Sequence, residues 1–208
     1  MQTLFNKTSL VLSKNNHAVF ELPMKLIIIA IIMAITISAV LGGLQIYSIN
    51  QTRANCEAAV NTIVSNIQTV YSDVGSNLHF PLKIKEAGWG QIDYIRIGNK
   101  LDSLQERALI RWSTDGQQNG KEIRSSGGAS ITTTTAPASK IKELLNDRPY
   151  ISVSDCSWSQ PLELVAGDYE IAVAALSWDS NGDQDGKQEM IDTFILIYDY
   201  NAYLASLS

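Results

Sequence analysis

The stretch from Leu26 to Leu44, LIIIAIIMAITISAVLGGL, determines how the rest of the chain is interpreted. It has no charged residue, and its only polar side chains are those of Thr36 and Ser38. As a helix, these nineteen residues rise about 28 Å, close to the ~30 Å hydrocarbon thickness of a bilayer. A buried core helix would need more protein around it than the chain supplies. We therefore predict one membrane span.

The charges flanking this span predict its orientation. Lys7, Lys14 and Lys25 precede it, whereas the first basic residue after it is Arg53. Because basic residues are enriched on the cytoplasmic side, we expect a cytoplasmic N-terminus and an extracytoplasmic remainder. The alternative is a secretory signal cut near the small-residue pair Gly42-Gly43, which would release a soluble domain.

A helical pattern continues beyond the span, with apolar residues on one side only. No Pro or Gly interrupts it between Leu44 and Val74, and Gly75 and Pro81 then end it. The apolar stripe consists of Ile49, Cys56, Ala59, Val60, Ile63, Val64, Ile67 and Val70. We expect one helix to about Asp73 whose stripe packs on the following domain; a coiled-coil seam to another chain is the alternative.

The remaining sequence predicts strands and turns. Hairpins are expected around Gly88–Gly90 and around the turn 115–120, further strands at 131–135, 151–158, 169–178 and 189–200, and a short helix at 138–147. The predicted fold class is α+β, a long transmembrane and amphipathic helix packed on an antiparallel sheet or β-sandwich. The expected segments are a cytoplasmic leader (1–18), the helix (19–78) and a β-rich extracytoplasmic domain (79–208).

The two cysteines, Cys56 and Cys156, both follow the span. In an oxidising compartment such a pair predicts a disulfide, which in the loop-closure treatment stabilises the fold by about 4 kcal/mol. Two unpaired buried thiols are the alternative.

The junction HAVFELPMKLIII, from His17 to Ile29, resembles the leader junction of archaeal type IV prepilins. A polar leader ends in the small residue Ala18 and is followed by Val19-Phe20-Glu21 and a membrane span. The resemblance implies that a prepilin-type peptidase cuts between Ala18 and Val19. It also implies a pilin-like fold, packing against other pilin-like subunits through the N-terminal helix, and a surface filament with the β-rich domain facing outward for adhesion.

An acidic loop predicts an optional calcium site. Its oxygen-bearing side chains alternate with other residues, and a Gly follows for the turn, as a cation-wrapping loop requires. The candidate ligands are Asp179, Asn181, Asp183, Asp185 and Asp192. A solvated acidic turn is the alternative.

Composition and motifs limit the function classes. With 16 basic and 21 acidic residues, the chain lacks the positive surplus of a nucleic-acid binder. No nucleophile motif accompanies His17 or His79, so we expect no catalysis and no required cofactor. Asn50 begins an Asn-Gln-Thr glycosylation triplet. The leading hypothesis is a pilin-like structural subunit; the alternative is a membrane-anchored monomeric binding domain, stabilised by calcium if the acidic loop binds it.

Overall fold

The structure is a computed structural model that describes residues 5–73, 75–98, 108–146, 150–152, 161–179 and 193–207. Only the backbone is described for residues 5–21, 146, 150–152 and 178–179. The helices are α1 (Phe5–Tyr71), α3 (Ala138–Asn146) and α4 (Tyr200–Ala205). The strands are β1 (Asn77–Ile84), β2 (Ile92–Ile97), β3 (Leu109–Thr114), β4 (Gln117–Glu122), β5 (Thr132–Thr135), β6 (Tyr150–Ser152), β7 (Leu162–Leu164), β8 (Gly167–Asp179) and β9 (Thr193–Asp199).

The chain divides into two compact units, Met1–Tyr47 and Ser48–Ser208. We call the second unit the head. Helix α1 contributes to both, because it is continuous through the boundary. It begins at Phe5, earlier than the sequence pattern indicated, and contains Pro23. It ends at Tyr71 rather than near Asp73, and the Ser76 hydroxyl donates 3.1 Å to the carbonyl of Val70.

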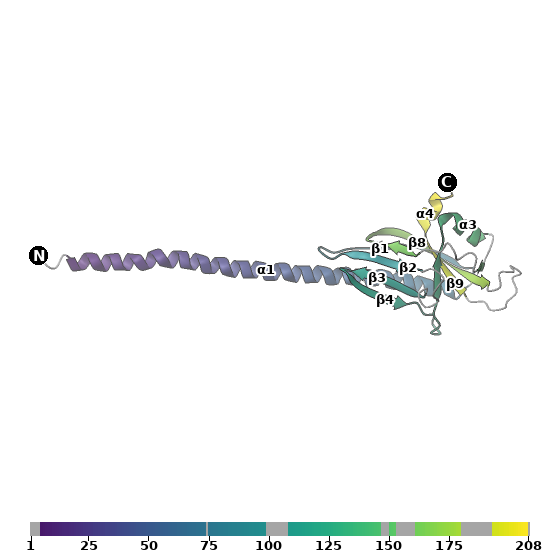
Figure 1. Cartoon of the computed structure of the whole chain (residues 1–208), viewed down its shortest axis with the longest axis horizontal. Coiled ribbons are helices and arrows are strands. Elements are labelled where there is room, and N and C mark those ends of the chain that lie inside the picture. Colours follow the sequence, from purple (N-terminus) through teal and green to yellow (C-terminus); the bar gives the residue numbers. More distant parts are fainter. Residues whose placement is uncertain are drawn as a thin grey trace. The chain divides into compact units, whose positions relative to one another are not determined.

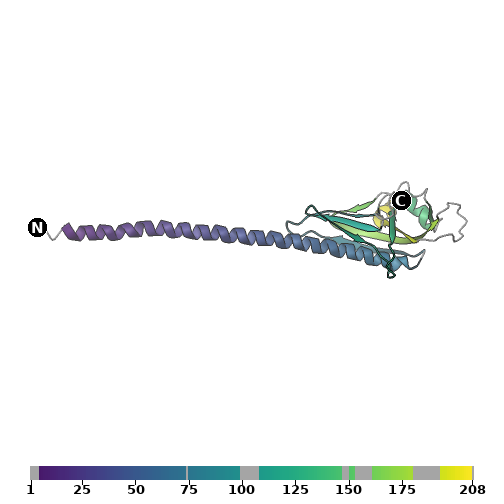
Figure 2. The same cartoon turned by 60° about the horizontal axis from the view of Figure 1, so that its bottom comes forward.

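Two sheets form the body of the head. One has the order β1-β8-β9-β5, with β6 also pairing with β8; the other has the order β4-β3-β2-β7. Most pairs are antiparallel, but β5–β9 and β6–β8 are parallel. The predicted α+β layout is therefore confirmed, and of the two expected arrangements, one sheet or a sandwich, the head has two sheets. Figures 1 and 2 show the C-terminal part of α1 running alongside these strands.

One apolar core joins the helix to both sheets. From Cys56 to Val70, the stripe of α1 lies in a single buried cluster with β1, β8 and β9 of the first sheet and β2, β3 and β7 of the second, whereas Ile49 is half-buried and outside this cluster. Alternation places every second residue of a strand on this face, as Phe80, Leu82 and Ile84 of β1 illustrate. The chain's own sheets thus cover the stripe, and the coiled-coil alternative is wrong for it.

The opposite face of β8 and β9 forms a second core with α3 and α4. Ala172, Ala174 and Leu176 of β8 are buried there together with Ile141 and Leu144 of α3. Both faces of β8 are therefore covered, which explains why its sequence reads as an almost continuous apolar run.

Two hairpin predictions have different outcomes. The first is wrong: β1 pairs with β8, and β2 pairs with β3 and β7, so the Gly88–Gly90 break crosses between sheets. The second hairpin, β3–β4, is confirmed, but its turn is only Asp115-Gly116. Both residues have positive φ (51° and 73°), which is the requirement of a tight two-residue hairpin turn.

Candidate functional site

The N-terminal part of α1 exposes apolar side chains on every side. Between residues 22 and 47, all side chains are exposed except that position 42, a glycine, is intermediate. This is the one helix among the described residues that is long and apolar enough to cross a membrane. The predicted span therefore has the length and composition of a membrane helix; its topology remains part of the proposal below.

The two polar side chains of this segment are satisfied within the helix itself. The Thr36 hydroxyl donates 2.8 Å to the carbonyl of Ile32, and the Ser38 hydroxyl donates 2.9 Å to that of Ala34. Such back-bonding leaves no hydroxyl proton that needs water. The surface is therefore compatible with lipid or with the apolar surface of another helix.

The second part of α1 is covered on one side. Ile63 and Ile67, for example, are fully buried in the core, whereas Ser65 between them is exposed. Burial against two sheets gives these side chains about 2–3 kcal/mol each in transfer free energy. This part of the helix is consequently a structural element of the head, not a free stalk.

Cys56 lies fully buried within this stripe. Burial raises the pKa of its thiol to about 11, and the negative charge of Glu57 adds to the rise. The protonated thiol is a weak nucleophile at neutral pH. Its predicted partner, Cys156, lies outside the described residues, and no disulfide to Cys56 is present within the described part of the chain.

Polar side chains of α1 hold the loop between β1 and β2 against the helix, and we call this arrangement the clamp. We define the clamp as Ser48, Thr52 and Asn55 of α1 together with the loop of residues 85–91. Thr52 Oγ1 accepts from the Ala87 amide (2.8 Å) and faces the Ala87 carbonyl oxygen at 3.4 Å. Ser48 Oγ accepts from the amide of residue 89 at 3.2 Å, and Asn55 Nδ2 donates to the carbonyl of residue 85 at 3.2 Å.

Two glycines permit this close approach. A Cβ added at Gly90 would meet Thr52 Oγ1, would lie 2.7 Å from Thr52 Cβ, and would lie 2.9 Å from the Ser48 carbonyl oxygen. Gly88 has φ +55°, and a Cβ there would lie 2.9 Å from Ser48 Cβ. The Gly-Trp-Gly sequence that suggested a hairpin is instead the place where a loop crosses directly over a helix.

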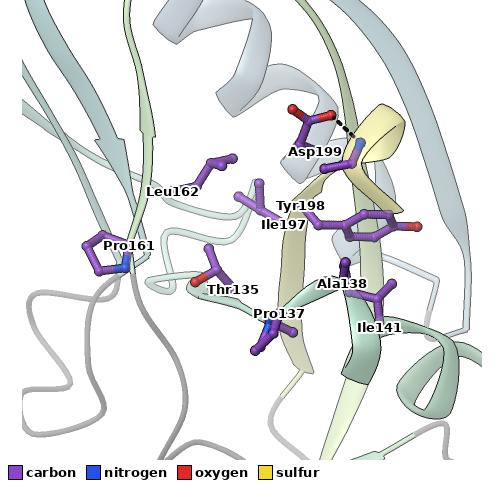
Figure 3. A pocket seen from close by; sticks show the side chains of 11 residues that line it. Thr135, Pro137, Ala138, Ile141, Pro161, Leu162, Ile197, Tyr198 and Asp199 are labelled. Carbon is purple, nitrogen blue, oxygen red and sulfur yellow. Dashed lines mark hydrogen bonds between the residues drawn. The ribbon is translucent and has the colours of Figure 1, made fainter. Parts of the chain in front are cut away.

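A pocket of about 580 Å³ lies between β5, β9, α3 and α4, next to the start of β7 (Figure 3). Its walls are mostly apolar: Pro137, Ile141, Pro161, Leu162 and Ile197 line it.

Three polar side chains, those of Thr135, Tyr198 and Asp199, also line the pocket. The Thr135 Oγ1 atom and the Tyr198 hydroxyl are buried and have no hydrogen-bond partner among the described residues. Burial raises the pKa of Tyr198. Asp199 accepts 3.1 Å from the Ala202 amide, which caps α4. The pocket therefore suits a small apolar molecule with one polar group.

Most other predicted site residues lie outside the described part of the chain or have only a described backbone. The side chains of Ala18 and Val19 are not described, although their backbone is helical. Asp179 ends β8, and the remaining calcium candidates Asn181, Asp183, Asp185 and Asp192 lie outside the described residues. The described residues contain no group of three or more His, Cys, Asp or Glu side chains arranged to hold a metal.

Asn50 is exposed on α1, as a glycan acceptor requires. Thr52 of the same triplet, however, is fully buried beneath the loop of residues 85–91. A glycan would therefore have to be attached before this loop docks.

Sequence reasoning missed the clamp and the pocket. A signal for the clamp existed: Ser48 and Thr52 precede Cys56 at four-residue spacing, so they continue the buried stripe with small polar residues. The pocket had no such signal, because it depends on the parallel pairing of β5 with β9. Comparisons of the chain with models of protein families, with curated proteins and with solved structures find no match.

Proposed function

We propose that this protein is a membrane-anchored, pilin-like structural subunit, with the head on the extracytoplasmic side. One observation carries the proposal: a single helix is apolar and uncovered all round before Tyr47, and buried on one side in a β-rich head after Ser48. The first part matches lipid or neighbouring helices, and the second part holds the head without a linker.

Pro23 supports the proposed leader cut. Within a long helix, a proline removes one hydrogen bond and its ring crowds the carbonyl four residues earlier, which here belongs to Val19. After a cut between Ala18 and Val19, this carbonyl would belong to the first residue of the helix, which is free to turn aside. Processing would therefore remove the constraint that the preceding helix places on this carbonyl.

The test is the mass and N-terminal sequence of the full chain isolated from its native membrane. We expect a start at Val19 and recovery of the protein in sheared surface filaments. Ala18→Phe should block the cut, whereas Ala18→Gly keeps a small side chain and serves as the matched control. An intact leader in the wild type would contradict subunit processing, and a start after Gly42 or Gly43 would contradict membrane anchoring.

The Cys56–Cys156 bridge is part of this proposal. We expect thiol labelling of the unfolded, unreduced protein to find no free thiol, and labelling after reduction to find two. Two labelled thiols without reductant would contradict the bridge.

The alternative function, a membrane-anchored binding domain, is favoured by the pocket and its buried Thr135 Oγ1. Ile141→Trp would fill the pocket and should abolish saturable binding of a small apolar fluorophore, while Leu204→Trp on exposed α4 should not. Equal binding by both variants would contradict this function. Calcium binding by the acidic loop would raise the thermal midpoint on addition of calcium chloride but not of magnesium chloride.

A further inference from the structure

Three connections lie at the same end of the head. β1 ends at Ile84, opposite the start of β8 at Gly167. β2 begins at Ile92, opposite the end of β3 at Thr114. β7 pairs antiparallel with β2 and therefore also runs toward this end. The loop of residues 85–91, the Asp115-Gly116 turn and the short link after Leu164 thus share one face, which we call the loop face.

The loop face displays two exposed apolar side chains. Trp89 is 56% exposed and Val165 is 49% exposed. In the described part of the head, the other large apolar side chains that are similarly exposed are Leu204 and Leu207, in and just after α4. Two connections, each running between the two sheets, therefore expose an apolar side chain on the same face, which a soluble surface does not require.

The loop face is tied to a residue that closely follows the apolar stretch in the sequence. Within the head, the backbone amide of Trp89 donates to Ser48 Oγ at 3.2 Å. Ser48 follows Leu44, the last residue of the uncharged apolar stretch, by four residues, which is about 6 Å along a helix. A bilayer that encloses the apolar stretch would therefore have its surface within a few residues of Ser48.

The loop that carries Trp89 is held in place. Besides its hydrogen bonds to α1, the Gln91 amide donates to Asp115 Oδ1 (3.0 Å), and the Asp115 amide donates to the Gln91 carbonyl (3.0 Å). The Ile92 amide donates to Glu86 Oε1 at 2.7 Å. Such a loop loses little conformational freedom when it meets another surface, so its tryptophan is preorganised for contact.

We propose that the loop face docks on the extracytoplasmic surface of the bilayer, with Trp89 inserted at the boundary between headgroups and acyl chains. Tryptophan favours this boundary because its ring is largely apolar while its indole N–H can bond to headgroups or water. Val165 adds apolar contact beside it. This inference rests on the membrane anchoring proposed above and adds a second attachment, made by the head itself.

The test is depth-resolved fluorescence quenching of the full chain in phosphatidylcholine vesicles that carry bromine at shallow or deep acyl positions. We expect shallow bromines to quench wild-type emission, and Trp89→Phe to lose roughly half or more of that quenching because Trp89 is the tryptophan at the interface. The three other tryptophans are the buried Trp112 together with Trp158 and Trp178. All three are present in every variant compared, so the comparison isolates the emission of Trp89.

A matched control moves the tryptophan to the other end of the head. The control protein combines Trp89→Phe with Ser126→Trp. Ser126 lines the same hollow as Gln68, and the Gln68 side chain donates to the nearby Arg124 carbonyl at 2.7 Å, so the new indole ring lies near Gln68. Gln68 is 20 residues beyond Ser48, or about 30 Å along α1. This protein has the wild-type number of tryptophans but should not regain shallow quenching.

Each outcome has a separate meaning when resistance to carbonate extraction is measured in parallel. If the chain stays in the membrane but wild type and Trp89→Phe are quenched equally, the docking is overturned and the anchoring stands. If carbonate releases the chain, both fail. If Trp89 resists lipid quenchers while its emission shifts with protein density, a second copy covers the loop face and the lipid assignment is overturned.

Discussion

Helix α1 has two regions, residues 22–47 and 48–71, with opposite surroundings. Ile35 in the first region is 65% exposed, whereas Ile63 in the second is fully buried. The first region is richer in apolar residues and has them on all sides, whereas the second has them on one side only. A one-sided stripe can be covered by the chain's own sheets, whereas an all-round apolar surface needs an environment that encloses the helix.

The largest expected effect comes from breaking the first region. Ile31→Asp combined with Ile35→Asp should oppose membrane insertion by about 6 kcal/mol, since each central carboxylate costs roughly 3 kcal/mol. The share of protein that resists carbonate extraction should fall, while the thermal midpoint of the head stays unchanged.

The control for this change is Ile31→Leu with Ile35→Leu, which keeps the apolar surface and should behave as wild type. A head that melts earlier in the double aspartate protein would show that the two regions are not independent.

A charge in the second region should have the opposite effect: it should destabilise the head and leave membrane retention unchanged. Ile63→Asp places a carboxylate in the core between the sheets and should lower the free energy of unfolding by about 4 kcal/mol or more. Chemical denaturation of the full chain in micelles measures this loss, and membrane retention should persist.

Ser65→Asp is its matched control, because it adds the same charge on the exposed side of the same turn of α1. Its effect should stay within about 0.5 kcal/mol. Equal stability of the two variants would mean that the stripe does not hold the head.

The clamp at the start of the second region gives a smaller effect. Gly90→Ala introduces a Cβ against Thr52 and should destabilise the head by about 1–3 kcal/mol. Gly127→Ala, where the nearest atom is Ser125 Oγ at 3.9 Å, should be nearly neutral. Denaturation midpoints of both proteins provide the comparison.

Thr52 Oγ1 should account for part of that cost. In Gly90→Ala combined with Thr52→Ala, the contact with Oγ1 is removed, while the contacts of the new Cβ with Cβ of residue 52 (2.7 Å) and with the Ser48 carbonyl oxygen (2.9 Å) remain. The two changes should therefore together cost at least about 0.5 kcal/mol less than the sum of their separate costs. If the losses of stability caused by the two changes simply added, the contact with Thr52 Oγ1 would not contribute to the cost of Gly90→Ala.

The smallest effect concerns the β3–β4 turn beside the clamp. Asp93 Oδ2 accepts from Ser113 Oγ (2.6 Å) and from the Gly116 amide (2.9 Å), and these bonds lower the pKa of Asp93. A lowered pKa in the folded state means that the stabilisation is present above the pKa of the unfolded chain and is lost as the pH falls through the folded value. Asp93→Asn should therefore cost about 1 kcal/mol or less at pH 7.

The check is the difference in stability between wild type and Asp93→Asn as a function of pH. It should be constant from about pH 5 to 8 and narrow below about pH 4. Asp168→Asn, an exposed carboxylate on β8, is the control. A difference that grows on acidification would have the wrong sign for a carboxylate stabilised by these bonds.

Local patterns predicted the elements that depend on local chemistry. The one-sided apolar pattern predicted the packed stripe of α1, the Asp-Gly pair lay within the predicted β3–β4 turn, and the strand predicted at 169–178 lies within β8. In each case neighbours in the sequence decide the conformation.

Strand partners could not be predicted in the same way. The alternation in β1 and β2 is satisfied equally by pairing with each other or with other strands. In the structure they belong to different sheets, and the loop between them crosses over Ser48 and Thr52. The pocket depends in turn on the parallel contact of β5 with β9, which no local signal encodes.

The shared core of α1 with β8 and β9 has a consequence for how the protein is made. Ile63 lies in one cluster with Ile195, 132 residues later in the chain, and β8 and β9 follow the other partners of the stripe in the sequence. The stripe therefore cannot be fully covered until β9 has been synthesised, and such long-range closure is slow. During this interval the nascent chain is exposed to aggregation and proteolysis, so a chaperone that shields the stripe until β9 arrives would raise the yield of folded protein.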